Sequence, residues 1–172
     1  MITRQRQCVI TDTSVLINFL AVDQASLLLD HPHFHFFLTD HVRIEVTELY
    51  PDQFARLEAI LSDGSLQQLT VNTPEELEIF AALTLERRLG PGECAAIAAA
   101  VYRGYAIAID DRAAIKQVIR LFPDLRIETT QSIVVGLIRS GCLSVAAADN
   151  LKDRWQNHHR FRLPIRSFRE LL

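Results

Sequence analysis

Residues 8–20, with the sequence CVITDTSVLINFL, join a short apolar run to a longer hydrophobic segment through three polar residues. The run at residues 8–11 is typical of a short buried strand. Residues 15–20 open a helix, for which Asp12, Thr13 or Ser14 can serve as the N-cap. The stretch therefore predicts a strand followed at once by a helix, with Asp12 at the carboxyl end of the strand.

The same alternation of strand and helix continues along the chain. Further strands are predicted at residues 34–39, 66–71, 105–109 and 125–128. Further helices are predicted at residues 42–49, 52–61, 74–89, 94–103, 113–122, 132–139, 144–157 and 165–172. Strands separated by helices imply right-handed crossovers and a parallel sheet covered on both faces. No repeat or linker divides the sequence, so we expect an α/β fold in a single domain over residues 1–172.

Acidic residues fall where such a sheet places its ligand site, outside the carboxyl ends of the strands. Asp12 follows the first strand, and Asp110 and Asp111 follow the strand at 105–109. Glu93 lies in the first turn of the helix before that strand. Glu45 lies one turn into the helix after the second strand.

Each of these acids also has an ordinary structural explanation. Asp12 and Asp111 could cap helices, Glu93 could complement a helix dipole for ~0.3–1 kcal/mol, and Glu45 could be solvated. Together, however, they would crowd like charges at one edge of the sheet, which raises their pKa values and costs stability unless cations bind. Carboxylates without His or Cys favour Mg²⁺ or Mn²⁺, and such ions support phosphodiester cleavage. The pattern therefore favours a divalent-metal site.

Four motifs occur in a characteristic order: ITDTS at 10–14, VRIEV at 42–46, GPGECAAIA at 90–98 and IDDR at 109–112. This order resembles the PIN-domain family, especially the branch related to VapC-type toxins, over about the first 145 residues. The resemblance implies a three-layer α/β/α sandwich around the parallel sheet and an endoribonuclease that depends on Mg²⁺ or Mn²⁺. Residues 145–172 would then be a C-terminal helical extension.

The resemblance also implies roles for the acids. Asp12, Glu93 and one of Asp110 or Asp111 would be the main metal ligands, and Glu45 would complete the catalytic group. The sequence leaves open which member of the aspartate pair faces the metal, since Asp110 continues the strand whereas Asp111 aligns better with a Thr-x-Asp pattern.

Supporting roles are expected for three further residues. Thr13 or Ser14 would orient Asp12 or a water through a hydroxyl hydrogen bond, and Arg112 is the best placed cation for a phosphate. One departure from the family is the sequence Thr39-Asp40-His41, where many relatives carry a proline. Asp40 is therefore a rival to Glu45.

Composition narrows the class of protein. The formal net charge of −3 argues against a protein that holds nucleic acid by bulk positive charge. Three scattered cysteines argue against disulfides or structural zinc and fit a reducing compartment. No apolar run approaches the ~20 residues that span a bilayer, and no export signal is recognised, so a cytoplasmic protein is expected.

Two other patterns are open to a binding role. His31, His33 and His35 alternate and could share a metal, but Phe34 and Phe36 favour a strand with a buried aromatic face. The basic run from His158 to Arg169 could be a solvated tail, an RNA contact or a partner contact.

Three functions are compatible with these features, and they are not equally favoured. The leading one is an endoribonuclease for single-stranded or structured RNA, including the toxin of a toxin–antitoxin pair, with an antitoxin partner and a homodimer as the family suggests. The second is an inactive PIN fold that binds RNA or protein, against which the retained acids argue. A metal-dependent phosphatase or phosphoacceptor ranks last, because position 14 is Ser rather than Asp and no Lys follows residues 125–128.

Overall fold

The computed structural model describes residues 6–172, and its centre is a five-stranded sheet in which every pairing is parallel. The strand order is β3-β2-β1-β4-β5. The strands are β1 (Gln7–Thr11), β2 (Phe34–Thr39), β3 (Gln67–Leu69), β4 (Ala106–Ala108) and β5 (Ile127–Glu128). Thr11 lies opposite Ala108, so β1 and β4 end side by side. This register brings the residues that follow both strands to one place.

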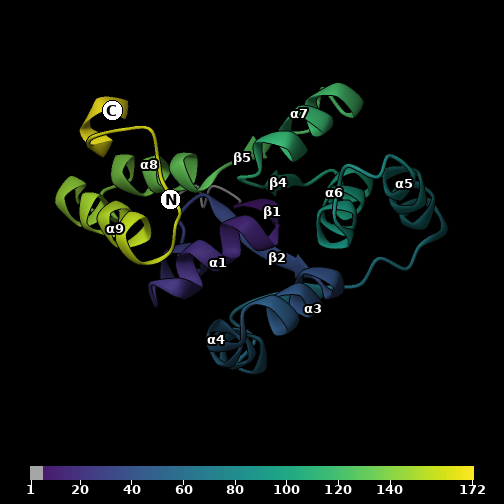
Figure 1. Cartoon of the computed structure of the whole chain (residues 1–172), viewed down its shortest axis with the longest axis horizontal. Helices are drawn as coiled ribbons and strands as arrows, with labels where there is room; N and C mark the ends of the chain where they lie inside the picture. Colours follow the sequence, from purple (N-terminus) through teal and green to yellow (C-terminus); the bar gives the residue numbers. More distant parts are fainter. Residues whose placement is uncertain (1–5) are drawn as a thin grey trace, which may run out of the picture.

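Helices cover both faces of the sheet, which confirms the three-layer α/β/α sandwich. They are α1 (Thr13–Ala21), α2 (Ser26–Leu29), α3 (Asp40–Leu49), α4 (Pro51–Ser62), α5 (Pro74–Leu85), α6 (Pro91–Arg103), α7 (Arg112–Leu121), α8 (Thr130–Arg139) and α9 (Val145–His158). In Figure 1, α5 and α6 lie to one side of the strands, and α1, α8 and α9 lie to the other.

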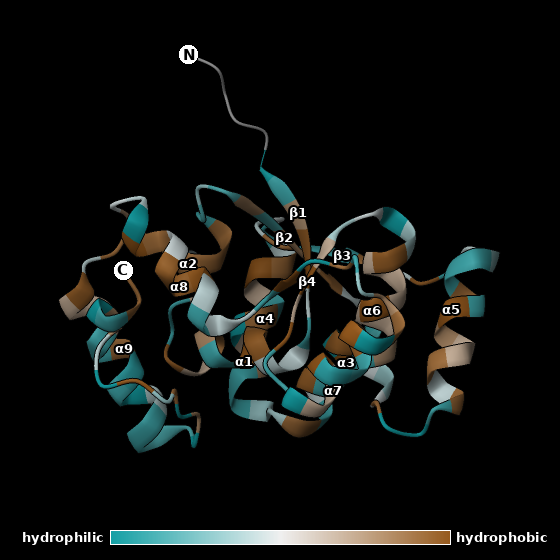
Figure 2. Ribbon diagram, turned by 90° about the horizontal axis from the view of Figure 1, so that it is seen from above, coloured by the Kyte–Doolittle hydropathy of each residue, from teal (hydrophilic) through white to brown (hydrophobic). Residues whose placement is uncertain are grey.

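Helix α6 packs most closely onto the sheet and contacts β1, β2 and β4. Its residues from Cys94 to Ala100 are all fully buried, and most of them are alanines. Small side chains allow the helix backbone to approach the strands, which fixes the position of the helix start beside the ends of β1 and β4. Hydrophobic residues gather on the strands, whereas the outer turns of α9 are largely polar (Figure 2).

The C-terminal residues belong to the same hydrophobic core. Trp155 of α9 is fully buried, and its ring meets that of Phe19 edge to face at a centroid distance of 5.7 Å. Phe168 is also fully buried. Among residues 6–172, no helix has the length and apolar character needed to cross a bilayer.

The predicted helix at residues 165–172 is wrong. Only a 3₁₀ turn, η1 (Phe168–Leu171), forms there, because Asp149 of α9 accepts hydrogen bonds from the Ser167 hydroxyl (2.6 Å) and the Phe168 N–H (2.8 Å). Ser167 keeps an extended backbone (φ −147°, ψ 148°) and caps η1 by accepting from the N–H of Arg169 (3.2 Å), so no helix runs through it. The predicted helix at 74–89 also ends early, at Leu85, and Arg87 follows with a φ of 51°.

Smaller differences concern element length. The strands predicted at 66–71, 105–109 and 125–128 shrink to two or three residues, since only these pair with a neighbouring strand. The short helix α2 was not predicted. The strand at 34–39 has the predicted bounds.

Candidate active site at the carboxyl edge of the sheet

Asp12 stands directly after β1 and is only 2% exposed. Its N–H donates to the carbonyl of Ala108 (2.8 Å), which joins it to the end of β4. Its Oδ2 accepts from the N–H (3.0 Å) and the hydroxyl (2.7 Å) of Ser14, and this caps α1. Its Oδ1 is buried and has no hydrogen-bond partner among the described residues. Burial raises the pKa of Asp12, against the lowering effect of the Ser14 bonds.

Glu45 reaches the same place from α3. Its Oε2 accepts from the hydroxyl of Thr13 (2.6 Å), and its Oε1 accepts from the N–H of Gly92 (2.8 Å). The carboxylate thus joins the starts of α1 and α6. A Cβ at position 92 would overlap the Glu45 carboxylate, so glycine is what allows this approach.

Glu93 occupies the first turn of α6, where its Oε2 accepts from the N–H of Gly90 (2.8 Å). Burial raises its pKa to about 7, and the negative charges of three other acids add to the rise. Those acids are Asp12, Asp111 and Glu45. Four carboxylates from four parts of the chain therefore share one electrostatic neighbourhood at this edge.

The structure separates the two members of the aspartate pair. Asp110 has both oxygens engaged: Oδ1 accepts from the Thr130 N–H (2.9 Å), and Oδ2 accepts from the Thr130 hydroxyl (2.5 Å) and Asn18 Nδ2 (3.0 Å). Asp111 is exposed and caps α7 through the Ala114 N–H (2.8 Å), and its charge acts on Glu93. Asp110 faces α1 and α8, whereas Asp111 belongs with the other carboxylates.

The other predicted site residues differ in whether they contact the carboxylates. Ser14 orients Asp12 as expected, but Thr13 donates to Glu45 instead. Arg112 is exposed at the start of α7. Asp40 bonds to its own neighbour His41, through the backbone N–H (3.1 Å) and Nδ1 (3.0 Å), and is not among the charges that act on Glu93. Glu45, not Asp40, is therefore brought to the carboxylate group.

The rings of the alternating histidines His31 and His33 lie with centroids 6.0 Å apart, but each ring also has a partner of its own. His31 is fully buried, stacks on Phe34 at a centroid distance of 4.5 Å, and has Nε2 at 3.3 Å from the Ile133 carbonyl. Burial lowers the pKa of His31 to about 4. His33 contacts the Ser140 hydroxyl instead (3.1 Å). These contacts favour the interpretation as an aromatic strand region.

The fit to a divalent cation rests on chemistry rather than on a finished cage. Across residues 6–172, no three His, Cys, Asp or Glu side chains converge closely enough to enclose an ion as they stand. Carboxylates repel one another in the absence of a cation, so an open arrangement is expected. The oxygen-only donors and the partnerless Oδ1 of Asp12 match what Mg²⁺ or Mn²⁺ requires.

Two residues at this edge of the sheet were not predicted from the sequence. Asn18 is 4% exposed and Thr130 is fully buried, and both bond to Asp110. A polar Asn within the apolar helix segment VLINFL was the available signal, because a buried amide must find hydrogen-bond partners. Thr130 belongs to the segment Thr129-Thr130, through which the family resemblance continues, but nothing local in the sequence predicts a role for it.

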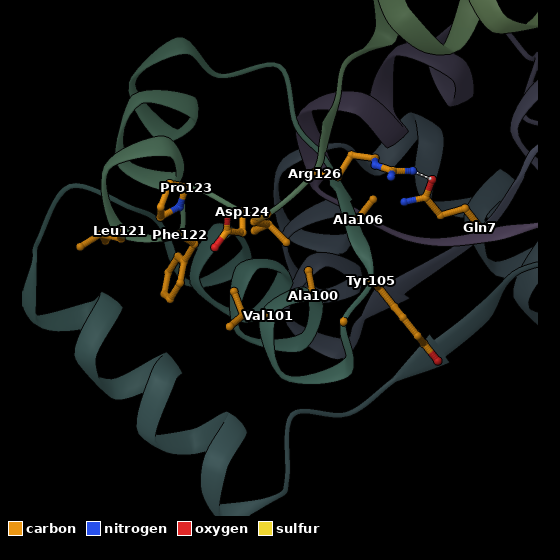
Figure 3. A pocket seen from close by; sticks show the side chains of 12 residues that line it. Gln7, Ala100, Val101, Tyr105, Ala106, Leu121, Phe122, Pro123, Asp124 and Arg126 are labelled. Carbon is orange, nitrogen blue, oxygen red and sulfur yellow. Dashed lines mark hydrogen bonds between the residues drawn. The ribbon is translucent and has the colours of Figure 1, made fainter.

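A separate hollow of about 480 Å³ lies at the other end of the strands (Figure 3). Its walls come from the start of β1, the α6–β4 turn and the loop between α7 and β5. Asp124 and Arg126 are the charged residues that line it, and Arg126 donates to the side chain of Gln7. It contains none of the four carboxylates, so its volume does not mark the candidate active site.

The sequence from residue 8 to residue 172 matches the family model DUF3368, described as a PIN domain. No curated protein sequence matches significantly. Among solved structures, a PilT N-terminus domain protein, SSO1118, from the hyperthermophilic archaeon Sulfolobus solfataricus P2 is 12% identical, with a TM-score of 0.50. That alignment covers 80% of this chain and 94% of the archaeal one.

Two further solved structures are similar at lower TM-scores. One is VapBC2 from Rickettsia felis, in a structure bound to a DNA fragment from the VapBC2 promoter, with a TM-score of 0.49. It is 13% identical, and the alignment covers 71% of this chain and 98% of that chain. FitAcB from Neisseria gonorrhoeae is 17% identical over 70% of this chain and 96% of that chain, with a TM-score of 0.43. At such identities the likeness concerns the fold alone.

Proposed function

Because this chain belongs to the PIN-domain family, we propose that it is a divalent-metal-dependent endoribonuclease that hydrolyses phosphodiester bonds in RNA. The observation that carries the proposal is the shared neighbourhood of four acids: burial raises the pKa of Glu93, and the charges of Asp12, Asp111 and Glu45 raise it further. A protein gains no stability from holding like charges together in this way. A site that binds a cation and a phosphate substrate accounts for this arrangement of carboxylates.

Asp12, Glu93 and Asp111 would hold the metal. When bound, Mg²⁺ or Mn²⁺ supplies Lewis-acid chemistry, since it polarises phosphoryl oxygens and lowers the pKa of water. Ser14 keeps Oδ2 of Asp12 occupied, which leaves the buried Oδ1 as that residue's free ligand atom. Glu45 is the remaining acid of the group, held by Thr13 and Gly92.

Two residues shape the surroundings of these ligands. Thr13 donates its hydroxyl to Glu45 and thereby fixes the direction of that carboxylate. Arg112 is exposed next to Asp111, where its guanidinium can bind a phosphate oxygen of the RNA backbone. With a net charge of −3, the protein needs such local cations to hold a polyanion.

A cleavage assay on single-stranded and structured RNA tests the proposal. Cleavage is expected to require Mg²⁺ or Mn²⁺, to stop with a chelator, and to be lost in Asp12→Asn and Glu93→Gln. Metal-stimulated cleavage that persists in both variants would rule out these residues as ligands. Calorimetry that shows no Mn²⁺ binding at millimolar concentration would instead favour an inactive PIN fold that binds RNA or protein.

The cellular role is a finer part of the same proposal. We infer a cytoplasmic toxin of a toxin–antitoxin pair that forms a homodimer and is held inactive by an antitoxin protein. Induced expression in bacteria would then arrest growth, and the Glu93→Gln variant, expressed to the same level, would not. Equal arrest by both proteins would contradict the toxin role.

A further inference from the structure

The carboxylate of Asp110 is the meeting point of two helices. It receives three hydrogen bonds: one from Asn18 Nδ2 of α1 and two from Thr130 at the start of α8. The Thr130 hydroxyl accepts a further bond from Asn18 Nδ2 (3.1 Å), so the three side chains form a closed triangle. Asn18 and Thr130 are buried and Asp110 is half-buried, and their shared hydrogen bonds hold the three side chains in one arrangement.

The backbone of Asp110 extends this network to the candidate metal ligands. Its N–H donates to the Ser14 hydroxyl oxygen (3.0 Å), and that hydroxyl donates to Oδ2 of Asp12 (2.7 Å). Asp111 is the next residue along the chain. Any shift of Asp110 is thus transmitted to Asp12 through one hydroxyl group and to Asp111 through one peptide unit.

The C-terminal helix supports the same network from outside. Trp155 Nε1 donates to the carbonyl of Asn18 (2.7 Å), and both residues are buried. Asn18 therefore has its backbone fixed by α9 while its side chain is fixed by Asp110 and Thr130.

Asp110 and Asp12 differ in the capacity that they have left for a metal. A carboxylate offers about four lone-pair sites, and Asp110 has three donors spread over both oxygens. Asp12 has both donors on Oδ2, and no donor in the described part of the chain, residues 6–172, reaches its Oδ1. Asp12 thus keeps a whole oxygen for a cation, whereas Asp110 keeps one lone-pair site, on Oδ1.

We propose that Asp110 is a positioning residue, which with Asn18 and Thr130 fixes Asp12 and Asp111 but does not itself ligate the metal. This inference rests on the proposed function, since it concerns how that site is held. It also assigns the two adjacent aspartates different tasks: Asp111 faces the cation, and Asp110 holds the edge together.

The test compares Mn²⁺ affinity, measured by calorimetry, across matched variants. Thr130→Val removes the hydroxyl and keeps the volume, and it is expected to weaken Mn²⁺ binding about 10- to 100-fold, as loss of a supporting hydrogen bond does at metal sites. Thr130→Ser restores the hydroxyl and should restore the affinity. Asp110→Asn should match Thr130→Val, and the double variant should lose no more than either, because both act through the same bond.

Ser132→Ala is the matched control. It removes side-chain hydrogen bonds to Glu128 and to the N–H of Thr129 at the same helix start, away from Asp110. If Thr130→Val acted only by disturbing the start of α8, Ser132→Ala would weaken Mn²⁺ binding as well. We expect Ser132→Ala to bind Mn²⁺ with the wild-type affinity. Asp111→Asn should abolish measurable binding.

Anomalous scattering from Mn²⁺-soaked crystals gives the direct answer. An ion within coordination distance of Asp12 and Asp111 but not of Asp110 supports the proposal. An ion coordinated by Asp110, or wild-type affinity in both Asp110→Asn and Thr130→Val, would overturn it.

Amide hydrogen exchange in metal-free protein keeps the positioning role separate from the metal site. The N–H groups of Asp110 and Ser14 should exchange about tenfold faster in Thr130→Val than in wild type, and Ser132→Ala should not change them. Absence of Mn²⁺ binding in the wild type would defeat the proposed function, whereas unchanged exchange in Thr130→Val would defeat the positioning role.

Discussion

The carboxyl ends and the amino ends of the β-strands differ in how their charged residues are surrounded. At the carboxyl edge, Asp12 is buried with no partner for its Oδ1 among residues 6–172, and burial together with like charges raises the pKa of Glu93. At the amino edge, Asp124 and Arg126 line the hollow of Figure 3, both are exposed, and Arg126 bonds to Gln7. Asp124 and Arg126 are solvated, and neither is among the charges that act on Glu93, so they give no reason to infer a function at this edge. The candidate site is therefore identified by the repulsion among its carboxylates and not by the volume of a hollow.

The largest expected effect comes from removing one charge at each edge. Asp111→Asn should lower the rate of metal-dependent RNA cleavage by about 10²–10³, the size of effect seen when one group that stabilises transition-state charge is lost. Asp124→Asn, the same change at the amino edge, should leave the rate within about twofold of wild type because Asp124 lies at the other end of the strands from the four carboxylates. Rates measured at one Mn²⁺ concentration, the one that saturates the wild type, check both. Equal losses would erase the distinction between the edges.

Two glycines provide a smaller version of the same comparison. Gly92→Ala should displace the Glu45 carboxylate, because the new Cβ would overlap it, and should lower the cleavage rate about tenfold. Gly104, which lines the amino-edge hollow, has a φ of 67° and open space around its Cα. Gly104→Ala should cost about 1 kcal/mol of stability through backbone strain and leave the rate unchanged.

Thermal unfolding and cleavage assays on both variants separate the two effects. Gly92→Ala is expected to show the larger loss of activity, and Gly104→Ala the larger loss of stability. A Gly92→Ala variant with full activity would show that the position of Glu45 has no bearing on catalysis.

The carboxyl edge was largely predictable because strand ends are visible in the sequence. Asp12 and the aspartate pair follow apolar runs, and the parallel register then brings Thr11 and Ala108 opposite each other. The family match from residue 8 to residue 172 confirms the resemblance from which the fold was expected. Pattern and spacing were sufficient here because each feature is local in the chain.

The division of tasks between Asp110 and Asp111 was not predictable. It depends on Asn18 and Thr130, which lie 92 and 20 residues away from Asp110 in the chain. The choice between Asp40 and Glu45 likewise depended on the approach of α6, where Gly92 meets Glu45. The helix predicted at 165–172 is wrong for the same reason, since Asp149 of α9 holds the extended Ser167 and the start of η1 in place. Contacts between distant segments leave little trace in a single sequence.

The smallest expected effect is the pH dependence of stability in metal-free protein. Glu93 has an ordinary pKa of 4.5 when unfolded and a pKa of about 7 in the folded chain, with burial as the main cause. Between these pH values the folded state binds more protons, so the stability contributed by protonated Glu93 is present at low pH and is lost as the pH rises through 7. Because Glu93 is only partly buried, solvent screens the effect.

The melting temperature should therefore fall by roughly 2–4 °C between pH 5.5 and pH 8, the change that about 1 kcal/mol produces in a domain of this size. Asp12 and Asp110, whose pKa values are also raised, act in the same direction, so the share of Glu93 is read as the difference from Glu93→Gln. Asp124→Asn at the amino edge should follow the wild-type curve. Mg²⁺ added at pH 8 should recover the lost stability in wild type more than in Glu93→Gln, because a cation replaces the proton among the carboxylates. If Glu93→Gln shows the same fall as wild type, the carboxyl edge does not hold Glu93 in the strained state on which the comparison of the two edges depends.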